Sequence, residues 1–340
     1  MTAKLLSCAL LLSFSISAQP SSSQVTGPVL GLVVDPASRL RPVLGVPGAS
    51  FLGQPISIDS SLQILAVSPH QDYVLASRTD TGDTVILTNL FDTVVSSTLT
   101  GASGIASVVL SPTGSSALLE SSDGATWMVA TGLPGSPTIT WQTDISSLAQ
   151  APVVAAISDN GKAVLAGAPT GNGASIYLFT SGNGPVDLMD VGQLGGVAFV
   201  THKTDALVGD SSANQVQLIQ DVTGAATSGI IADATAGVAS PVDLATSEDG
   251  NRIFIANSQP AGVLLLDPQL DGPLNISCDG TPTGFTRLAP NSIFSLTSPA
   301  KGLFWILEGG SANPRTVIVP PDPPSASDSS VQTQASGVKQ

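Results

Sequence analysis

The chain of 340 residues is acidic, with 25 acidic against 11 basic residues and a formal net charge of −14. This balance disfavours phosphate backbones and anionic membranes as partners, so we expect no nucleic-acid binding. Abundant Gly and Pro, together with many Val, Ile, Leu, Thr and Ser, are typical of short strands joined by tight turns.

Residues 1–18 have the pattern of a secretory signal peptide. Lys4 precedes an apolar stretch, Leu5–Ile16, and the small residues before Gln19 suit cleavage. The stretch is short for a bilayer span, so a membrane anchor is the less favoured alternative. We therefore expect a secreted or periplasmic protein without stable membrane insertion.

Removal of the signal would leave Cys278 as the only cysteine, which excludes an intramolecular disulfide. Because Cys278 lies in an alternating apolar pattern, LNISCDG, we expect a buried and inert thiol rather than a reactive one.

A strand–turn–strand pattern recurs about every 42–47 residues after this region. The copies lie at 65–77, 108–121, 155–167, 198–209 and 244–257, and a shortened one lies at 287–298. Most copies carry a small hydroxyl residue before a polar turn. A third apolar segment and a more polar fourth one follow. Such units predict four-stranded antiparallel blades, and hence an all-β fold with a single β-propeller.

Residues 31–57 resemble an abbreviated unit of the same kind. We expect a partial first blade that a strand from the other terminus, residues 316–320, closes. Seven blades over 28–320 are the prediction, and six blades with an additional N-terminal hairpin are the alternative. A short leader (19–27) and a Pro/Ser-rich tail (321–340) lack apolar periodicity and are predicted to be disordered.

One repeat resembles a known type. Residues 252–268, RIFIANSQPAGVLLLDP, are similar to the YVTN repeat of secreted bacterial propellers, a WD40-like type. Phe254, Ile255, Ala256, Asn257 and Asp267 match the pattern, whereas Ser77 replaces the asparagine in the copy DYVLAS. The resemblance implies a propeller and an extracytoplasmic setting but no particular activity, because propellers serve many functions.

No catalytic motif stands out. The sequence lacks both the Gly-x-Ser-x-Gly elbow and His-Glu-x-x-His. The two histidines, His70 and His202, fall in the same turn of different units, and we expect turns on a wide disc to be too far apart to meet. We therefore predict no catalytic residue and no cofactor.

The loops between second and third strands are the predicted ligand site, because loops of this kind crowd a channel mouth. Their polar residues are Arg78, Asp80, Asp83, Asp123, Asp210, Asn214 and Asn257. Oxygen ligands that converge there could hold Ca²⁺, and the pair Asp80 and Asp83 is the most ligand-like. Turn formation is the favoured interpretation of these residues, so metal binding stays open.

Two functional hypotheses follow. The first is an exported binding or scaffold module without catalytic activity, which binds a protein, peptide or glycan through the loops at one channel mouth. The second is a metal-assisted hydrolase or lactonase-like propeller enzyme. That enzyme would need three or four Asp, Glu, Asn or His side chains around one point of the channel.

Overall fold

The computed structural model describes residues 27–299 and 302–320. The predicted signal peptide (1–18) and tail (321–340) lie outside the described residues, as does the predicted leader apart from Gly27. Within the described ranges, no helix is long and apolar enough to cross a membrane.

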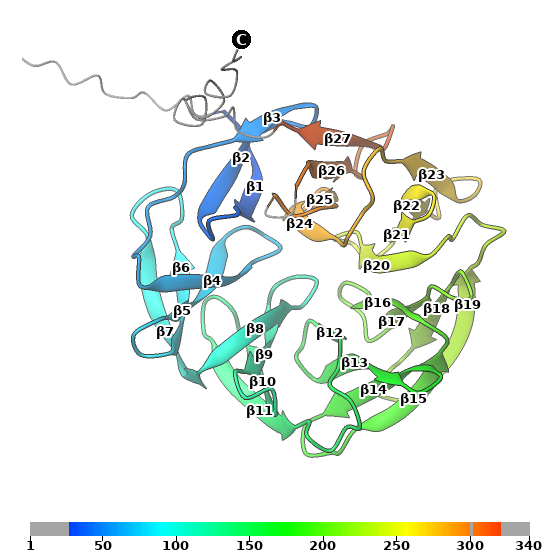
Figure 1. Ribbon diagram of the computed structural model, residues 1–340, viewed down its shortest axis with the longest axis horizontal. Coiled ribbons are helices and arrows are strands. Elements are labelled where there is room, and N and C mark those ends of the chain that lie inside the picture. Colours follow the sequence, from blue (N-terminus) through cyan, green and yellow to red (C-terminus); the bar gives the residue numbers. More distant parts are fainter. Residues whose placement is uncertain (1–26, 300–301, 321–340) are drawn as a thin grey trace, which may run out of the picture.

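Seven antiparallel sheets form blades around a central axis, which confirms the predicted seven-bladed β-propeller (Figure 1). Blade 1 contains β1 (Val29–Val34), β2 (Leu40–Val46) and β3 (Ala49–Leu52). Blade 2 contains β4 (Leu62–Val67), β5 (Tyr73–Arg78), β6 (Asp83–Thr88) and β7 (Val95–Ser103), and blade 3 contains β8 (Ile105–Leu110), β9 (Ser116–Ser121), β10 (Thr126–Thr131) and β11 (Thr138–Asp144). Blade 4 contains β12 (Val154–Ile157), β13 (Ala163–Thr170), β14 (Gly173–Thr180) and β15 (Val186–Val191).

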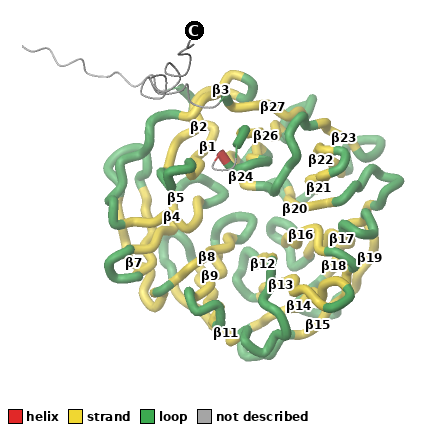
Figure 2. Tube along the Cα trace, viewed as in Figure 1, coloured by secondary structure: helices red, strands yellow, loops and turns green. Residues whose placement is uncertain are grey.

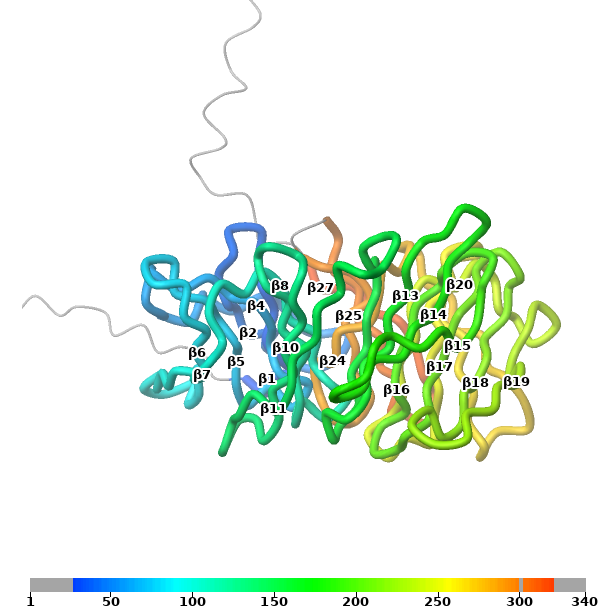
Figure 3. The backbone as a smooth tube through the Cα atoms, turned by 90° about the horizontal axis from the view of Figure 1, so that it is seen from below, coloured from blue at the N-terminus to red at the C-terminus, as the bar shows by residue number. Residues whose placement is uncertain are grey.

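The other three blades also have four strands each. Blade 5 contains β16 (Leu194–Phe199), β17 (Ala206–Asp210), β18 (Gln215–Gln220) and β19 (Thr227–Ala232). Blade 6 contains β20 (Pro241–Thr246), β21 (Ile253–Ser258), β22 (Ala261–Leu266) and β23 (Leu274–Ser277), and blade 7 contains β24 (Thr286–Ala289), β25 (Ile293–Ser295), β26 (Phe304–Glu308) and β27 (Arg315–Val319). Figure 2 shows these short strands joined by loops, and Figure 3 shows the loops gathered at the two ends of the disc.

Burial follows the position of a strand within its blade. Four consecutive residues are buried in β5 and in β6, whereas the outermost β7 exposes seven of its nine residues. Second and third strands pack against a neighbouring blade on each face, so both of their faces need apolar side chains. The innermost β4 has no fully buried residue, because one edge of it faces the channel.

Blade 1 corrects one prediction. Residues 315–319 form β27, which pairs with β26 in blade 7, where Phe304 lies opposite Val319. Blade 1 thus has three strands, and the expectation that residues 316–320 close it is wrong. A short loop joins β26 to β27. Pairing of β27 within blade 7 therefore costs less loop-closure entropy than pairing with blade 1 would. Blades 1 and 7 instead meet through an apolar cluster that includes Val43 and Leu288.

Apolar clusters fill the spaces between blades. Trp127 of blade 3 lies against Phe179 of blade 4, with ring centroids 5.4 Å apart, and Phe254 of blade 6 lies 5.2 Å from Phe294 of blade 7. Cys278 is buried in the cluster between blades 6 and 7, as expected. Burial is the main cause that raises the pKa of its thiol, which suits an inert side chain.

The recurring hydroxyl residue holds the hairpin turn between first and second strands. The Oγ atoms of Ser68, Ser111, Ser158 and Ser247 accept a hydrogen bond from the backbone N–H five residues later, at 2.9–3.2 Å. All four serines are buried. The hydroxyl therefore acts as a turn staple.

Glycine ends the same turn for a steric reason. Gly250 has a φ of +67°, and a Cβ atom there would lie 2.5 Å from the carbonyl oxygen of Thr201 in blade 5. The turn of blade 6 thus touches blade 5 through backbone, which only glycine permits.

Candidate ligand site in the central channel

Two adjoining cavities occupy the centre of the ring. Their volumes are about 280 and 560 Å³, and both are lined by Pro69, Val109, Leu110, Asp243, Phe285 and Arg287. Residues from the first strands of all seven blades line one or both of them. The cavities are therefore parts of one continuous central channel.

The channel walls combine apolar side chains with backbone edges. Within residues 27–299 and 302–320, no strand pairs with the inner edge of any first strand, so N–H and C=O groups of these strands face the channel. The side chain of Gln71 forms hydrogen bonds with two of these backbone groups. Its Oε1 accepts from the N–H of Leu32 (2.5 Å), and its Nε2 donates to the carbonyl of Arg287 (2.8 Å). One side chain thus joins blade 2 to blades 1 and 7.

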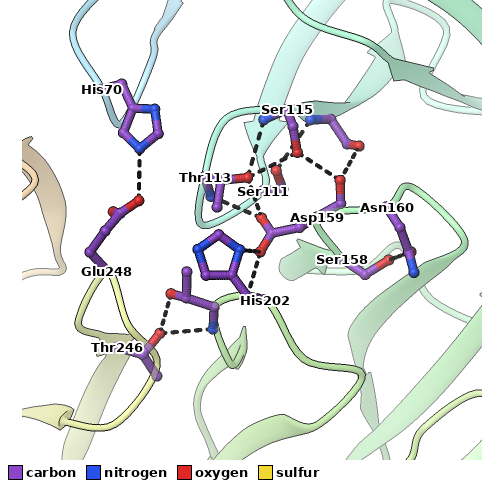
Figure 4. A network of polar contacts seen from close by, with 12 residues as sticks. His70, Ser111, Thr113, Ser115, Ser158, Asp159, Asn160, His202, Thr246 and Glu248 are labelled. Carbon is purple, nitrogen blue, oxygen red and sulfur yellow. Dashed lines mark hydrogen bonds and ion pairs between the residues drawn. The ribbon is translucent and has the colours of Figure 1, made fainter.

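At one end of the channel the hairpin turns between first and second strands form a polar network, part of which is drawn in Figure 4. Asp159 of blade 4 is central to it. Its carboxylate accepts from the hydroxyl of Thr113 in blade 3 (2.7 Å) and from the N–H of His202 in blade 5 (2.8 Å). The hydroxyls of Thr201 and Thr246 then join blades 5 and 6 at 2.7 Å.

Further contacts complete this turn network around the ring. Arg287 Nη2 donates to the carbonyl of Thr246 (2.5 Å), and the buried Tyr73 hydroxyl donates to the carbonyl of Gly114 (2.5 Å). The first bond links blades 7 and 6, and the second links blades 2 and 3. With the contacts of Gln71, every blade is bonded to another at this end.

The histidine turns overturn an expectation. Nε2 of His70 in blade 2 lies 2.9 Å from Oε1 of Glu248 in blade 6, and these blades stand on opposite sides of a seven-membered ring. The two side chains thus meet across the channel, as Figure 4 shows. The general assumption that turns of distant blades are too far apart to meet is therefore wrong for blades 2 and 6, because these two turns lean inward over the axis. His202 lies beside Asp159 instead, with 4.0 Å between Nδ1 and Oδ2.

Asp243, in β20, is the carboxylate that lines the channel. Its Oδ2 accepts from the N–H of Phe285 (2.7 Å) and its Oδ1 from the N–H of Leu244 (2.8 Å). Burial raises the pKa of Asp243 to about 6, although both hydrogen bonds lower it. A carboxylate among apolar walls loses hydration, and no cation among the described residues lies within ion-pair distance to offset that loss.

Arg287, in β24, is the other charged residue that lines both cavities. Its Nη1 lies 3.9 Å from Glu248 Oε2, and its guanidinium carbon lies 4.8 Å from the ring centroid of Phe294. Burial is the main cause that lowers the pKa of Arg287, and the charge of Glu248 opposes it. Arg287 thus has an anionic partner of its own.

The larger cavity extends to the opposite end of the channel, where Thr283, Gly284, Thr297, Ser298 and Pro299 line it. The loops between second and third strands lie at this end. We call this end of the channel the open end, and we call the other end, where the turn network lies, the turn end.

The predicted loop residues lie at this open end, mostly bonded within their own blades. In blade 2, Asp80 accepts from the N–H of Thr81 (2.9 Å), and Asp83 accepts from the Thr81 hydroxyl (2.8 Å). Arg78 lies 3.8 Å from Asp59. Local bonds of this kind fit the turn interpretation.

In blade 3, Asp123 accepts from the hydroxyl of Ser121, which is the main cause that lowers its pKa. In blade 5, burial raises the pKa of Asp210, but hydrogen bonds from Gly192 and Ser212 outweigh it, so the pKa lies below its ordinary value. Both carboxylates are thus held by neighbouring donors of the same blade or linker.

The two predicted amides fasten linkers between blades. Asn214 accepts from the N–H of Ser240 (2.6 Å), and Asn257 accepts from Ala239 (3.0 Å) and donates to Gly237 (2.9 Å). Among the residues that the structure describes, no group of three or more His, Cys, Asp or Glu side chains could hold a metal ion. A ligand role for the predicted loop residues stays a prediction.

Sequence reasoning missed Asp243 and Arg287. Both interrupt first strands that are largely apolar in the other copies, as in PVDLATS against LQILAVS. Charge in the innermost strand of a blade was the available signal, and alignment of the copies by strand position would have revealed it.

The comparisons with known proteins support the fold alone. No model of a known protein family matches the chain, and no curated protein matches it. A functionally unknown protein from Desulfotomaculum acetoxidans DSM 771 shares 14% identity at a TM-score of 0.52, over 86% of this chain and 99% of that one. Kuenenia stuttgartiensis hydrazine synthase shares 11% identity at a TM-score of 0.50, over 88% of this chain and 98% of that one.

Proposed function

We propose that this protein is an exported, non-catalytic binding module that takes its ligand into the central channel from the open end. The observation that carries the proposal is the continuous cavity, which reaches the first strands of all seven blades and holds two charged side chains among apolar ones. Concave sites with apolar walls and a few placed polar groups are typical of small-molecule sites. Export rests on the signal-like pattern of residues 1–18.

The two ends of the channel favour entry from one side. At the turn end, the pair of His70 and Glu248 crosses the axis, and the bonds of Asp159 join three neighbouring blades. At the open end, most of the loop side chains bond within their own blade or its linker. No specific observation favours the hydrolase alternative.

A neutral apolar dye, Nile red, tests the proposal. We expect wild-type protein to bind it with enhanced fluorescence. Ala198→Phe, which adds a ring at a residue in the lining of the smaller cavity, should weaken binding by about tenfold or more, whereas Ala49→Phe on the exposed outer strand of blade 1 should not. Circular dichroism would verify folding, and Ala245→Phe in the same cavity serves as a second blocking variant. A wild-type protein that fails to bind the dye, or blocking variants that bind it as well as Ala49→Phe does, would contradict the proposal.

A further inference from the structure

We propose that the channel binds a small organic monocation with an apolar body, of the alkylammonium kind, with the Asp243 carboxylate as its counter-ion. The inference rests on the proposed function above and names the ligand class of that site.

The charges along the channel do not cancel. Asp243 and Arg287 are the charged residues among those that line the two cavities. Arg287 is matched by Glu248, at 3.9 Å, and by the face of Phe294. Asp243 has only backbone N–H partners, and the described residues place no cation within ion-pair distance of it. One negative charge is therefore left facing the cavity.

A half-buried carboxylate that lines a cavity without a counter-ion is costly. Backbone N–H groups stabilise it, but they replace its hydration only in part. A ligand cation beside Asp243 would gain Coulomb energy in a medium less polar than water, where opposite charges attract strongly. The same cation would find no such gain at Arg287, whose positive charge repels it.

The cavity walls beside Asp243 favour a ligand with an apolar body. The smaller cavity has the half-buried Val109, Leu110 and Phe285 in its lining, and its volume of about 280 Å³ accommodates a short hydrocarbon chain. A hydrated inorganic cation would leave these walls without a partner, whereas an alkyl chain buries them against carbon. Charge and apolar surface together specify the amphiphile.

The structural role of Asp243 must be separated from this binding role. Through Phe285, its carboxylate also fixes the linker that leads into β24. Asp243→Asn keeps a side-chain oxygen that can accept one of the two N–H bonds, while it removes the charge. Asp187→Asn, at an exposed position of β15, is the matched control for the change in net charge.

Three probes with one hydrocarbon chain provide the test: n-hexylammonium, n-hexanol and n-hexanoate, titrated by calorimetry at pH 7.5. We expect wild type and Asp187→Asn to bind hexylammonium about tenfold more tightly than hexanol, and hexanoate most weakly. Asp243→Asn should bind hexylammonium no better than hexanol. Hexylammonium affinity of wild type should also fall between pH 7.5 and pH 5, as Asp243 takes up a proton, while hexanol affinity stays constant.

Other results would overturn the inference. Equal binding of hexylammonium and hexanol by wild type would show that the channel does not select charge, and a preference retained in Asp243→Asn would place the counter-ion elsewhere. His70, which lies 2.9 Å from Glu248, is another titratable group at the turn end, and His70→Ala should keep the preference. Failure of the charge preference alongside Nile red binding would leave the binding module standing, whereas failure of Nile red binding would remove the proposed function itself.

Discussion

At the turn end of the channel, side chains bond from blade to blade, whereas at the open end most of them bond within one blade or its linker. Asp159 at the turn end contacts the turns of blades 3 and 5, while Asp123 at the open end bonds Ser121 of its own turn. Both are acidic residues in short loops. The difference indicates that side chains at the turn end join neighbouring blades, and it motivates the proposal that ligands enter at the open end.

The largest expected effect contrasts two glycines whose φ angles differ by only 1°. Gly250→Ala at the turn end should lower the free energy of unfolding by roughly 2–5 kcal/mol, because strained φ adds to a contact of 2.5 Å with the carbonyl of Thr201. Gly124→Ala in the open-end loop has a φ of +68° and no atom within 4 Å, so it should cost about 1–2 kcal/mol. Urea unfolding measures both. Equal losses would contradict the account that the turn end is the tightly packed one.

The next effect probes the joint of blades 1, 2 and 7. Gln71→Ala leaves the N–H of Leu32 and the carbonyl of Arg287 without their side-chain partner, which should cost roughly 2–4 kcal/mol of stability. Gln63→Ala, at an exposed position of β4, should change stability by no more than about 0.5 kcal/mol. A Gln71→Ala protein as stable as this control would mean that the joint does not need the amide.

A third prediction concerns the channel itself, and here the substitution is expected to raise the stability rather than lower it. The folded pKa of Asp243, about 6, lies above the ordinary value of 3.8, so the folded state binds its proton more tightly than the unfolded state does. The contribution of Asp243 to the free energy of unfolding is fully present below pH 3.8 and is lost as the pH rises through about 6. Asp243→Asn should therefore stabilise the protein at pH 7.5. Removal of the charge contributes at most roughly 3 kcal/mol, and a weakened hydrogen bond takes back about 1 kcal/mol.

Thermal unfolding across pH 4 to 8 checks this sign. The advantage of Asp243→Asn should shrink toward pH 4, where the wild-type carboxyl is neutral as well. Asp187→Asn should show no such trend. A variant that is less stable than wild type at pH 7.5 and equally so at pH 4 would indicate that the bond to Phe285 outweighs the buried charge.

The smallest effect belongs to the pair that crosses the channel. His70 and Glu248 are both more than 30% exposed, so loss of their contact should cost less than about 1 kcal/mol. A double-mutant cycle with His70→Ala and Glu248→Gln measures the coupling directly. A coupling of several kcal/mol would make this bridge, rather than the backbone contacts, the main tie of the turn end.

The sequence predicted the architecture because hairpin periodicity is a local signal. Buried runs such as β5 and turns such as that of Gly250 are encoded within a few residues, so their recurrence sufficed for seven blades. The partner of β27 was predicted wrongly, because an apolar strand of five residues suits either terminal blade. Chain connectivity and packing decide which strand pairs with β27, and the sequence of one segment does not encode them.

The candidate site was not predictable in the same way. Asp243 and Glu248 are close in sequence, yet one lines the channel and the other meets His70 from blade 2. Such contacts depend on how far the turns lean toward the axis, and a repeat pattern does not specify this radius. The open-end residues were chosen by residue type, which marks turns and ligand sites alike.

The most direct test of the central claim is backbone amide NMR of deuterated protein during a titration with n-hexanol. A ligand in the channel should shift amides of the first strands, β1, β4, β8, β12, β16, β20 and β24, together with Phe285, and should leave β7, β11 and β15 unchanged. That result would support the channel as the binding site whatever charge the ligand carries. Shifts that gather on the outer strands, with the first strands silent, would contradict it.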